Sequence, residues 1–250
     1  MELILLGHIL GDFYVQTDKV AEEKRKSMIY MLLHCLLYTI VTGISFCILN
    51  GYTWKMEILK ISCLVYFEHL VVDLMKRECD KKFIKRECVI FLFDQVMHIL
   101  ILFLTVYIWG SYSLFRMNDY LTISGLDIRN CTIAVIAMLV CGKPAAVFVS
   151  LVFKTIPATI EREDQETSES STDEDIRTGS WIGILEREII LILGLMSQFG
   201  AIGFVLTAKS LARFKQLENK SFAEKYLVGT LLSALIAIGC IAVCRINWSA

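Results

Sequence analysis

The sequence predicts an all-α protein: a polytopic membrane helix bundle of about six transmembrane helices with a short N-terminal re-entrant or tilted helix. Of the 250 residues, 56% are hydrophobic and only two are proline. The apolar residues are gathered in blocks of about 20, the helix length that crosses roughly 30 Å of hydrocarbon. Charged residues lie between these blocks, so a net charge of −1 conceals a separation of water-facing ends from lipid-facing middles.

The first apolar segment, residues 3–15, is too short to cross a bilayer as a helix. Gly7, His8, Gly11 and Asp12 interrupt it. Polar groups and backbone at membrane depth are tolerated where the surrounding protein satisfies them. The sequence therefore predicts a re-entrant or tilted helix that packs against the rest of the bundle.

Six longer apolar blocks follow in the sequence. They cover residues 28–49, 56–75, 88–109, 131–153, 189–208 and 226–244. Each is long enough for a transmembrane helix. Gly142, Lys143 and Pro144 break the fourth block near its middle.

Lysine and arginine indicate the orientation of the helices. Residues 19–26 carry four of them and residues 76–86 carry six, so both segments are predicted to face the cytoplasm. If every block crosses the membrane, the five basic residues between 209 and 225 fall on the opposite side. Two alternatives remove this conflict: the fourth block is a re-entrant hairpin, or the fifth block does not cross.

An acidic segment rich in serine and threonine, residues 161–177, is predicted to be a disordered linker. With this linker, the chain is predicted to have four parts. These are an N-terminal membrane bundle (1–110), a loop with the broken fourth block (111–160), the linker itself, and a C-terminal helical pair (178–250).

Histidine and aspartate are paired in the N-terminal bundle. The chain has four histidines, and three of them have an aspartate four residues away. Two side chains at this spacing share one face of a helix. If the basic segments are cytoplasmic, these groups lie roughly 3–15 Å below that membrane surface and can meet in one layer.

Ionisable groups at this depth are costly unless they pair, meet water or bind an ion. Imidazole and carboxylate together suit a divalent metal ion such as Zn²⁺, Mn²⁺ or Fe²⁺. The candidate metal ligands are His8, Asp12, His34, His69, Asp73, Asp94 and His98. For any single pair, a hydrogen bond between the histidine and its aspartate is the better explanation, whereas three pairs and His34 in one layer favour a metal or proton-handling site.

Three functions are compatible with this pattern. A metal site facing the cytoplasm would suit a hydrolase of a lipid or lipid-linked substrate, although the sequence assigns no catalytic residue. A proton- or ion-coupled transporter would use the same residues as a relay. A non-catalytic membrane protein would use them to hold helices together. The lipid bilayer is the one partner indicated, since no basic helix interleaved with aromatic residues suggests nucleic acid, and a protein partner cannot be named.

The C-terminal half has a second polar cluster. Arg187, Lys209 and Arg213 border apolar blocks. Interfacial anchoring explains such residues, and a rim that binds a lipid headgroup or a phosphate is the functional alternative.

Several motifs resemble those of a bacterial integral-membrane family, domain-of-unknown-function family 3307. They are LLGHILGDFYVQTD, KRKS, EHLVVDLMK and FLFDQVMH, with IGILER, AIGFVLTAKSLARF and YLVGTLLS resembling the tail of its longer members. The chain departs from the family pattern at Lys225, where an aromatic or small residue is expected. The resemblance implies a multi-pass protein of the bacterial plasma (inner) membrane and brings no activity with it. It points to the seven candidate ligands and to Gln16.

Overall fold

A computed structural model describes residues 2–49, 56–83, 86–109, 122–123, 126–155 and 173–248. The chain forms two compact units, Met1–Ile136 and Ala137–Ala250. Within the described residues the regular structure is helical, apart from two short antiparallel strands, β1 (Thr122–Ile123) and β2 (Leu126–Asp127). The predicted all-α class is confirmed.

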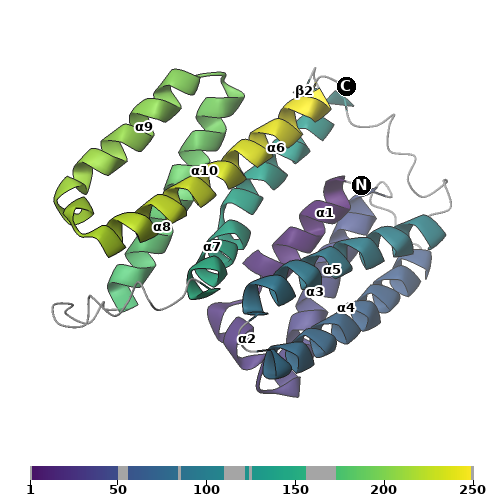
Figure 1. Cartoon of the computed structure of the whole chain (residues 1–250). Coiled ribbons are helices and arrows are strands. Elements are labelled where there is room, and N and C mark those ends of the chain that lie inside the picture. Colours follow the sequence, from purple (N-terminus) through teal and green to yellow (C-terminus); the bar gives the residue numbers. More distant parts are fainter. Residues whose placement is uncertain are drawn as a thin grey trace. The chain divides into compact units, whose positions relative to one another are not determined.

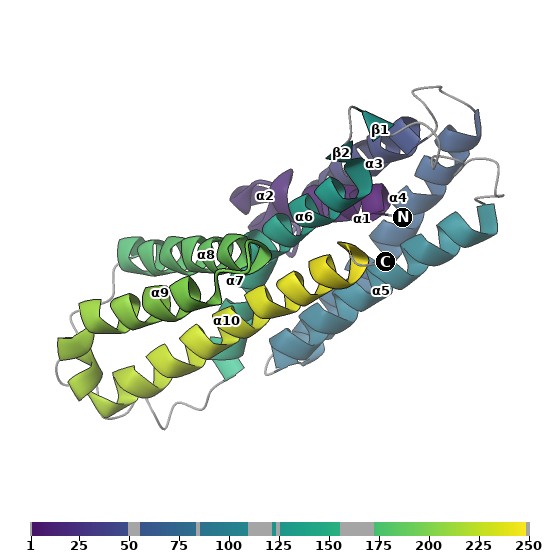
Figure 2. The same cartoon turned by 90° about the horizontal axis from the view of Figure 1, so that it is seen from above.

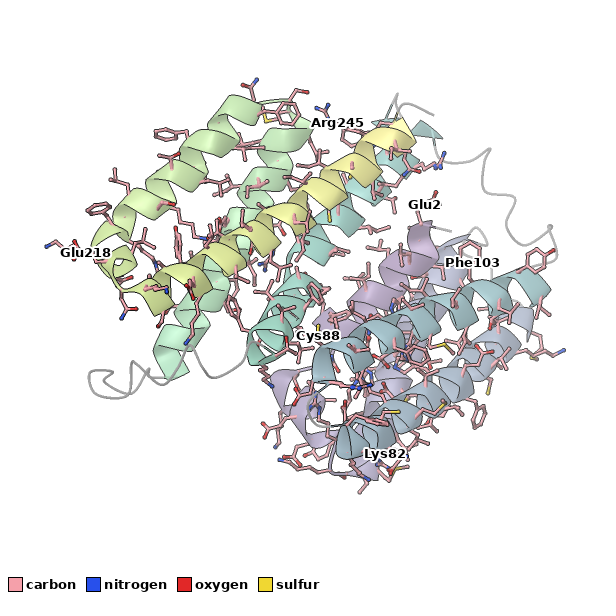
Figure 3. All side chains as sticks on the ribbon, in the orientation of Figure 1. Glu2, Lys82, Cys88, Phe103, Glu218 and Arg245 are labelled. Atoms are coloured by element: carbon pink, nitrogen blue, oxygen red, sulfur yellow. The ribbon has the colours of Figure 1, made fainter. Side chains whose placement is uncertain are left out.

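The first unit is built on three long helices. They are α3 (Met28–Leu49), α4 (Met56–Lys82) and α5 (Glu87–Trp109), preceded by α1 (Glu2–Ile9), the π-helical turn η1 (Leu10–Tyr14) and α2 (Asp18–Glu23). Figure 1 shows α1 and α4 lying against α3, and α5 lying against α4. In Figure 3, Lys82 and Cys88 mark where α4 ends and α5 begins, and Phe103 lies farther along α5.

An apolar core joins these helices away from the α4–α5 connection. Ile4 of α1, Phe46 of α3, Ile58 and Ile61 of α4 and Leu102 of α5 belong to it, and all are buried. The polar side chains of the bundle therefore lie toward the end that contains the α4–α5 connection.

The second unit begins at Ala137, within α6 (Ile128–Cys141), and continues with α7 (Lys143–Thr155). It continues with α8 (Asp173–Leu195), α9 (Phe199–Ala212), a 3₁₀ turn η4 (Phe214–Glu218) and α10 (Lys220–Trp248). α10 packs along α7 and α8, and α9 lies beside α8, as Figure 2 shows. Glu218 just before α10 and Arg245 near its end mark the two ends of this helix in Figure 3.

Four helical segments of the described chain are long and apolar enough to cross a membrane. They are Met28–Ile48, Glu87–Thr105, Arg129–Thr155 and Lys220–Trp248. The larger number of spans expected from the sequence is not confirmed. Helix α4 has 27 residues, but Glu57, Lys60, Glu68 and Asp73 interrupt its apolar part.

Large apolar side chains cover the outside of the helices. Ile29 is 77% exposed, Phe204 is 74% exposed and Tyr107 is 81% exposed. Helix α9 contains no buried residue at all. Apolar surface of this extent indicates a membrane or a partner rather than water, which supports membrane embedding.

The fourth apolar block bends but does not turn back. The Gly142 amide donates to the Met138 carbonyl (3.0 Å), and the Ala146 amide donates to the Gly142 carbonyl (3.1 Å), so helical bonding continues across the break. Pro144 lies in the first turn of α7, where its missing N–H is tolerated. Of the two alternatives for the topology, the re-entrant hairpin is therefore wrong.

The fifth block, expected as one helix over 189–208, is two helices. α8 ends at Leu195 and α9 begins at Phe199. Ser197 takes a left-handed conformation between them (φ 62°). Arg245 of α10 stabilises this turn by donating to the Gly194 carbonyl (3.1 Å) and to Ser197 Oγ (2.5 Å).

The predicted linker, 161–177, lies mainly outside the described residues. Its last five residues, 173–177, form the start of α8.

Candidate metal centre

The site is assembled from four elements of the first unit. His34 lies near the start of α3, His69 and Asp73 lie in the second half of α4, and Asp94 and His98 lie near the start of α5. Because consecutive helices run in opposite directions, these positions fall at the same end of the bundle. Asp12 reaches them from η1. The predicted convergence of these side chains is confirmed.

His34 Nε2 is the centre of the closest group. It lies 3.1 Å from His69 Nε2, 3.3 Å from Asp12 Oδ1 and 3.4 Å from Asp73 Oδ2. Donors bound to one tetrahedral ion by bonds of about 2.1 Å lie about 3.4 Å from one another. The atoms of Asp12, His34 and His69 also lie within 4.8 Å of one another, so these three residues could hold a metal ion.

A second group lies beside the first. Asp73, Asp94 and His98 are buried and also bring ligand atoms within 4.8 Å of one another. A third group, Cys35 with His69 and Asp73, meets the same criterion. His69 and Asp73 each belong to two groups, so the three groups form one continuous cluster.

His8 does not belong to any of these groups. Its Nδ1 lies 3.1 Å from the Tyr38 hydroxyl, and its ring lies 5.8 Å from that of His98. It is nevertheless buried, with 1% of its surface exposed. The structure therefore places His8 beside the cluster rather than among the candidate ligand groups.

The histidine–aspartate contacts run both within helices and between elements, where His34 contacts Asp12 and Asp73. His69 Nε2 lies 3.8 Å from Asp73 on its own helix, farther than from His34 on α3. His98 Nδ1 lies 2.9 Å from the main-chain oxygen of Asp94 and 3.4 Å from its carboxylate. The explanation in which each histidine only satisfies the aspartate one turn away does not account for these distances.

Two lysines lie against the carboxylates. Lys24 Nζ is 3.3 Å from Asp73 Oδ2, and Lys76 Nζ is 2.6 Å from Asp94 Oδ2. Gln95 donates to Asp12 Oδ2 (2.9 Å) and to Asp94 Oδ2 (3.1 Å). Each buried carboxylate therefore has a donor that fixes one oxygen.

Every histidine of the cluster keeps one ring nitrogen without a hydrogen-bond partner among the described residues. These atoms are His8 Nε2, His34 Nδ1, His69 Nδ1 and His98 Nε2, and all are buried. Buried polar atoms without partners are uncommon and indicate a water, an ion or a functional role. With the donor spacing given above, this residue set could hold a metal ion.

A π turn and a glycine bring Asp12 into place. Asp12 lies in η1, and π turns inside helices are frequent at functional sites. A Cβ at Gly11 would come 2.9 Å from Tyr38 Cδ2 and 3.3 Å from Tyr38 Cα. Only glycine therefore allows this segment to approach α3 so closely.

Two cavities adjoin the cluster. The smaller, about 10 Å³, is lined by Tyr38, Glu68, His69 and His98 among others, and this is near the minimum for one water. The larger, about 260 Å³, lies between α4 and α5 and is lined by Lys76, Arg86 and Asp94 with mainly apolar neighbours. Asp94 thus faces both the candidate ligands and a cavity.

Sequence reasoning missed three members of the cluster. Tyr38 stacks on His69 with ring centroids 3.7 Å apart, Lys24 pairs with Asp73, and Cys35 belongs to a candidate ligand group. Tyr38 could have been found, because it follows His34 by four residues and shares its helix face. Lys24 is brought in by tertiary structure, which the local sequence does not reveal.

Comparison with protein families finds a match over the N-terminal half of the chain. Residues 1–123, which include the whole cluster, match the family described as "Protein of unknown function (DUF3307)". Neither the curated proteins nor the solved structures include a significant match to the chain.

Proposed function

Since this chain belongs through residues 1–123 to domain-of-unknown-function family 3307, which carries no assigned activity, we propose a function from the geometry of its buried cluster. The N-terminal unit binds a divalent metal ion through Asp12, His34 and His69. Its activity is metal-dependent hydrolysis of a lipid or lipid-linked substrate. Zn²⁺, Mn²⁺ or Fe²⁺ suits a site of imidazole and carboxylate ligands.

The observation that carries the proposal is the spacing of donor atoms around His34 Nε2. Three partners from three other positions lie 3.1–3.4 Å away. Two imidazole nitrogens and two carboxylates at this separation are difficult to explain by helix packing alone, because buried charged groups are costly without an ion or a partner.

The distribution of polar residues favours an enzyme over a relay through the membrane. A proton or ion path needs polar groups across the whole bilayer. Here the apolar core of Phe46, Ile58, Ile61 and Leu102 occupies the bundle beyond the cluster. The polar cluster therefore occupies one end of the bundle, and apolar side chains fill the bundle beyond it.

The larger cavity supplies features that a lipid-like substrate needs. Its apolar wall includes Val72, Ile90 and Phe93, and its charged residues are Lys76, Arg86 and Asp94. The apolar wall suits an acyl or prenyl chain, and the two cations suit an anionic group of the substrate.

Asp12, His34 and His69 would hold the metal, which would supply a nucleophile at neutral pH by lowering the pKa of a bound water. Asp94 would serve as the proton acceptor, because it lies next to the donor groups and lines the cavity. Lys76 and Arg86 orient the anionic end of the substrate. The proposed location is the bacterial plasma (inner) membrane, with the cluster near the cytoplasmic surface.

Metal content tests the binding step. The full-length protein, purified in detergent, is analysed for metals by mass spectrometry alongside His69→Gln and Glu68→Gln. Glu68 is a matched control, because it neighbours His69 but is held by Thr105 Oγ1 (2.7 Å) outside the donor groups. We expect bound metal in the native protein and Glu68→Gln and its loss in His69→Gln. Equal metal content in both variants would refute the proposed ligand set.

Hydrolysis is tested separately from binding. The metal-loaded protein is assayed in mixed micelles with bis(4-nitrophenyl) phosphate and with a 4-nitrophenyl ester of a fatty acid. We expect Asp94→Asn to keep the metal at Asp12, His34 and His69 while losing about 100-fold or more in rate. Unchanged turnover in this variant would remove Asp94 as the base.

A further inference from the structure

The second unit contains a larger cavity that shares no residue with the His/Asp cluster. It measures about 540 Å³ and lies among α7, α8, α9 and α10. This is within the range of roughly 300–1,000 Å³ typical of small-molecule sites. The residues that line it lie beyond the segment matched by the family.

Four cationic side chains line this cavity. They are Arg187, Lys209, Arg213 and Lys225, and Glu186 is the only acidic residue among the lining residues. Lys209 forms an ion pair with Glu186 and neutralises it. The cavity therefore keeps an excess of positive charge beside an apolar helix surface.

Two of the cations are already held by the protein. The guanidinium of Arg187 is buried and donates to the Cys141 carbonyl (2.6 Å) and to Ser233 Oγ (3.3 Å). Lys209 Nζ donates to Thr230 Oγ1 (3.0 Å) and lies 5.1 Å from the centre of the Tyr226 ring. The side chains of Arg213 and Lys225 make no hydrogen bond or ion pair with any described residue, so their charges are available to a ligand.

Glu186 offers an unused acceptor in the same cavity. Its side chain is 5% exposed, and Oε1 has no hydrogen-bond partner among the described residues. A ligand that carries a hydroxyl or another donor next to its anionic group would satisfy this oxygen.

The remaining wall is apolar. Val149 and Phe153 of α7 and Ile182 of α8 contribute to it. A Cβ at Gly229 of α10 would come 2.9 Å from Phe153 Cζ, so α10 lies close against this wall. We propose that the cavity binds the phosphate headgroup of an anionic amphiphile, with Arg213 and Lys225 as its main charge partners and the apolar wall beside its chain.

Binding is measured on the purified full-length protein in a non-ionic detergent. The probes are dihexanoyl phosphatidic acid, dihexanoyl phosphatidylcholine and inorganic phosphate. We expect the phosphatidic acid to bind and the zwitterionic phosphatidylcholine to bind at least about tenfold more weakly, because charge-assisted bonds to the phosphate monoester dominate. Equal affinity for the two lipids would overturn the proposal.

Paired variants distinguish the cavity from general surface charge. Arg213→Gln/Lys225→Gln removes two cations from the cavity, whereas Lys215→Gln/Lys220→Gln removes two exposed cations from neighbouring positions outside it. We expect only the first pair to weaken phosphatidic acid binding by about tenfold or more. The same loss in both pairs, or no loss in the first, would refute the site.

Glu186→Gln provides a test in the opposite direction. It removes the single negative charge that lines the cavity and keeps the shape of the side chain, so affinity for dihexanoyl phosphatidic acid should rise severalfold. A purely structural role of Glu186 predicts no such gain. If inorganic phosphate binds and the variants change its affinity in the same way, the natural ligand is a free phosphate. If inorganic phosphate does not bind, the natural ligand is a lipid. Because these residues lie outside the His/Asp cluster, the outcome is independent of the metal proposal.

Discussion

At the scale of single residues, Gln95 connects the two halves of the candidate metal centre. Its amide donates to Asp12 Oδ2 and to Asp94 Oδ2, which belong to different candidate ligand groups. Each carboxylate thus has one oxygen occupied and its orientation fixed. In other metal sites, removing a group that holds a ligand in this way lowers metal affinity by about 10–100-fold.

Replacing Gln95 by leucine tests this connection. Leucine is similar in size to glutamine but makes neither hydrogen bond, so metal affinity should fall by roughly 10–100-fold. Isothermal titration with Zn²⁺ would measure it. Val96→Leu, at an outward-facing position on the same helix with 52% exposure, is the control and should bind like the native protein. Native affinity in Gln95→Leu would show that the carboxylates are fixed without this amide.

Gly11 sets the distance between η1 and α3. In Gly11→Ala the new methyl group meets the backbone and ring of Tyr38, so η1 must move away and carry Asp12 from His34. We expect metal affinity to fall by about tenfold or more, as ligand geometry tolerates only small displacements. Gly203→Ala is the control, because a Cβ there meets nothing within 4 Å. Equal metal binding by the two variants would contradict the role of this close approach.

At the scale of secondary structure elements, Arg187 joins three helices of the second unit. From α8 it reaches the Cys141 carbonyl at the end of α6, the Gly142 carbonyl (3.5 Å) and Ser233 of α10. The bend between α6 and α7 leaves the Cys141 carbonyl available for a side-chain donor, while the Gly142 carbonyl also accepts from the Ala146 amide. A buried guanidinium thus stabilises a break in a helix that would otherwise leave the Cys141 carbonyl unsatisfied.

Arg187→Met should destabilise the second unit. The Cys141 carbonyl loses its charged donor while buried, which costs about 1–3 kcal/mol, whereas the Gly142 carbonyl keeps the Ala146 amide. Thermal unfolding of the purified protein, followed by circular dichroism, should show a lower midpoint. Lys215→Met removes an exposed cation nearby and should leave the midpoint unchanged. A midpoint equal to that of the native protein in Arg187→Met would show that the bend does not depend on this side chain.

The long helices could be predicted because blocks of apolar residues have no other stable arrangement in a bilayer. The convergence of His34, His69 and His98 followed from their spacing and depth. The partner of Asp12 could not be predicted, since the π turn of η1 changes the angular position of this residue and directs it to His34 on α3. The break after Leu195 was hidden for a similar reason, because Arg245, distant in sequence, stabilises a turn made of ordinary residues.

At the scale of the whole molecule, the two basic segments of the first unit lie at one end of it. Lys24 contacts Asp73, and Arg77 Nη1 lies 3.1 Å from Met28 Sδ. The charge distribution therefore predicts that this end, and the cluster next to it, face the cytoplasm.

Cysteine labelling in cells tests this orientation. A variant whose only cysteine is Cys79, an exposed residue on α4, should react with a membrane-impermeant maleimide in inside-out vesicles but not in intact cells. A cysteine-free protein carrying Tyr107→Cys, near the opposite end of α5, should give the reverse pattern. Labelling of Cys79 in intact cells would invert the orientation.

The lysines paired with Asp73 and Asp94 have a consequence for the cluster when no ion is bound. Lys24 and Lys76 bring two positive charges to these carboxylates, the same charge as one divalent cation. The two buried carboxylates are therefore neutralised by the protein itself and do not repel each other in the absence of a metal ion. The first unit can thus fold with its polar cluster assembled before any metal ion arrives.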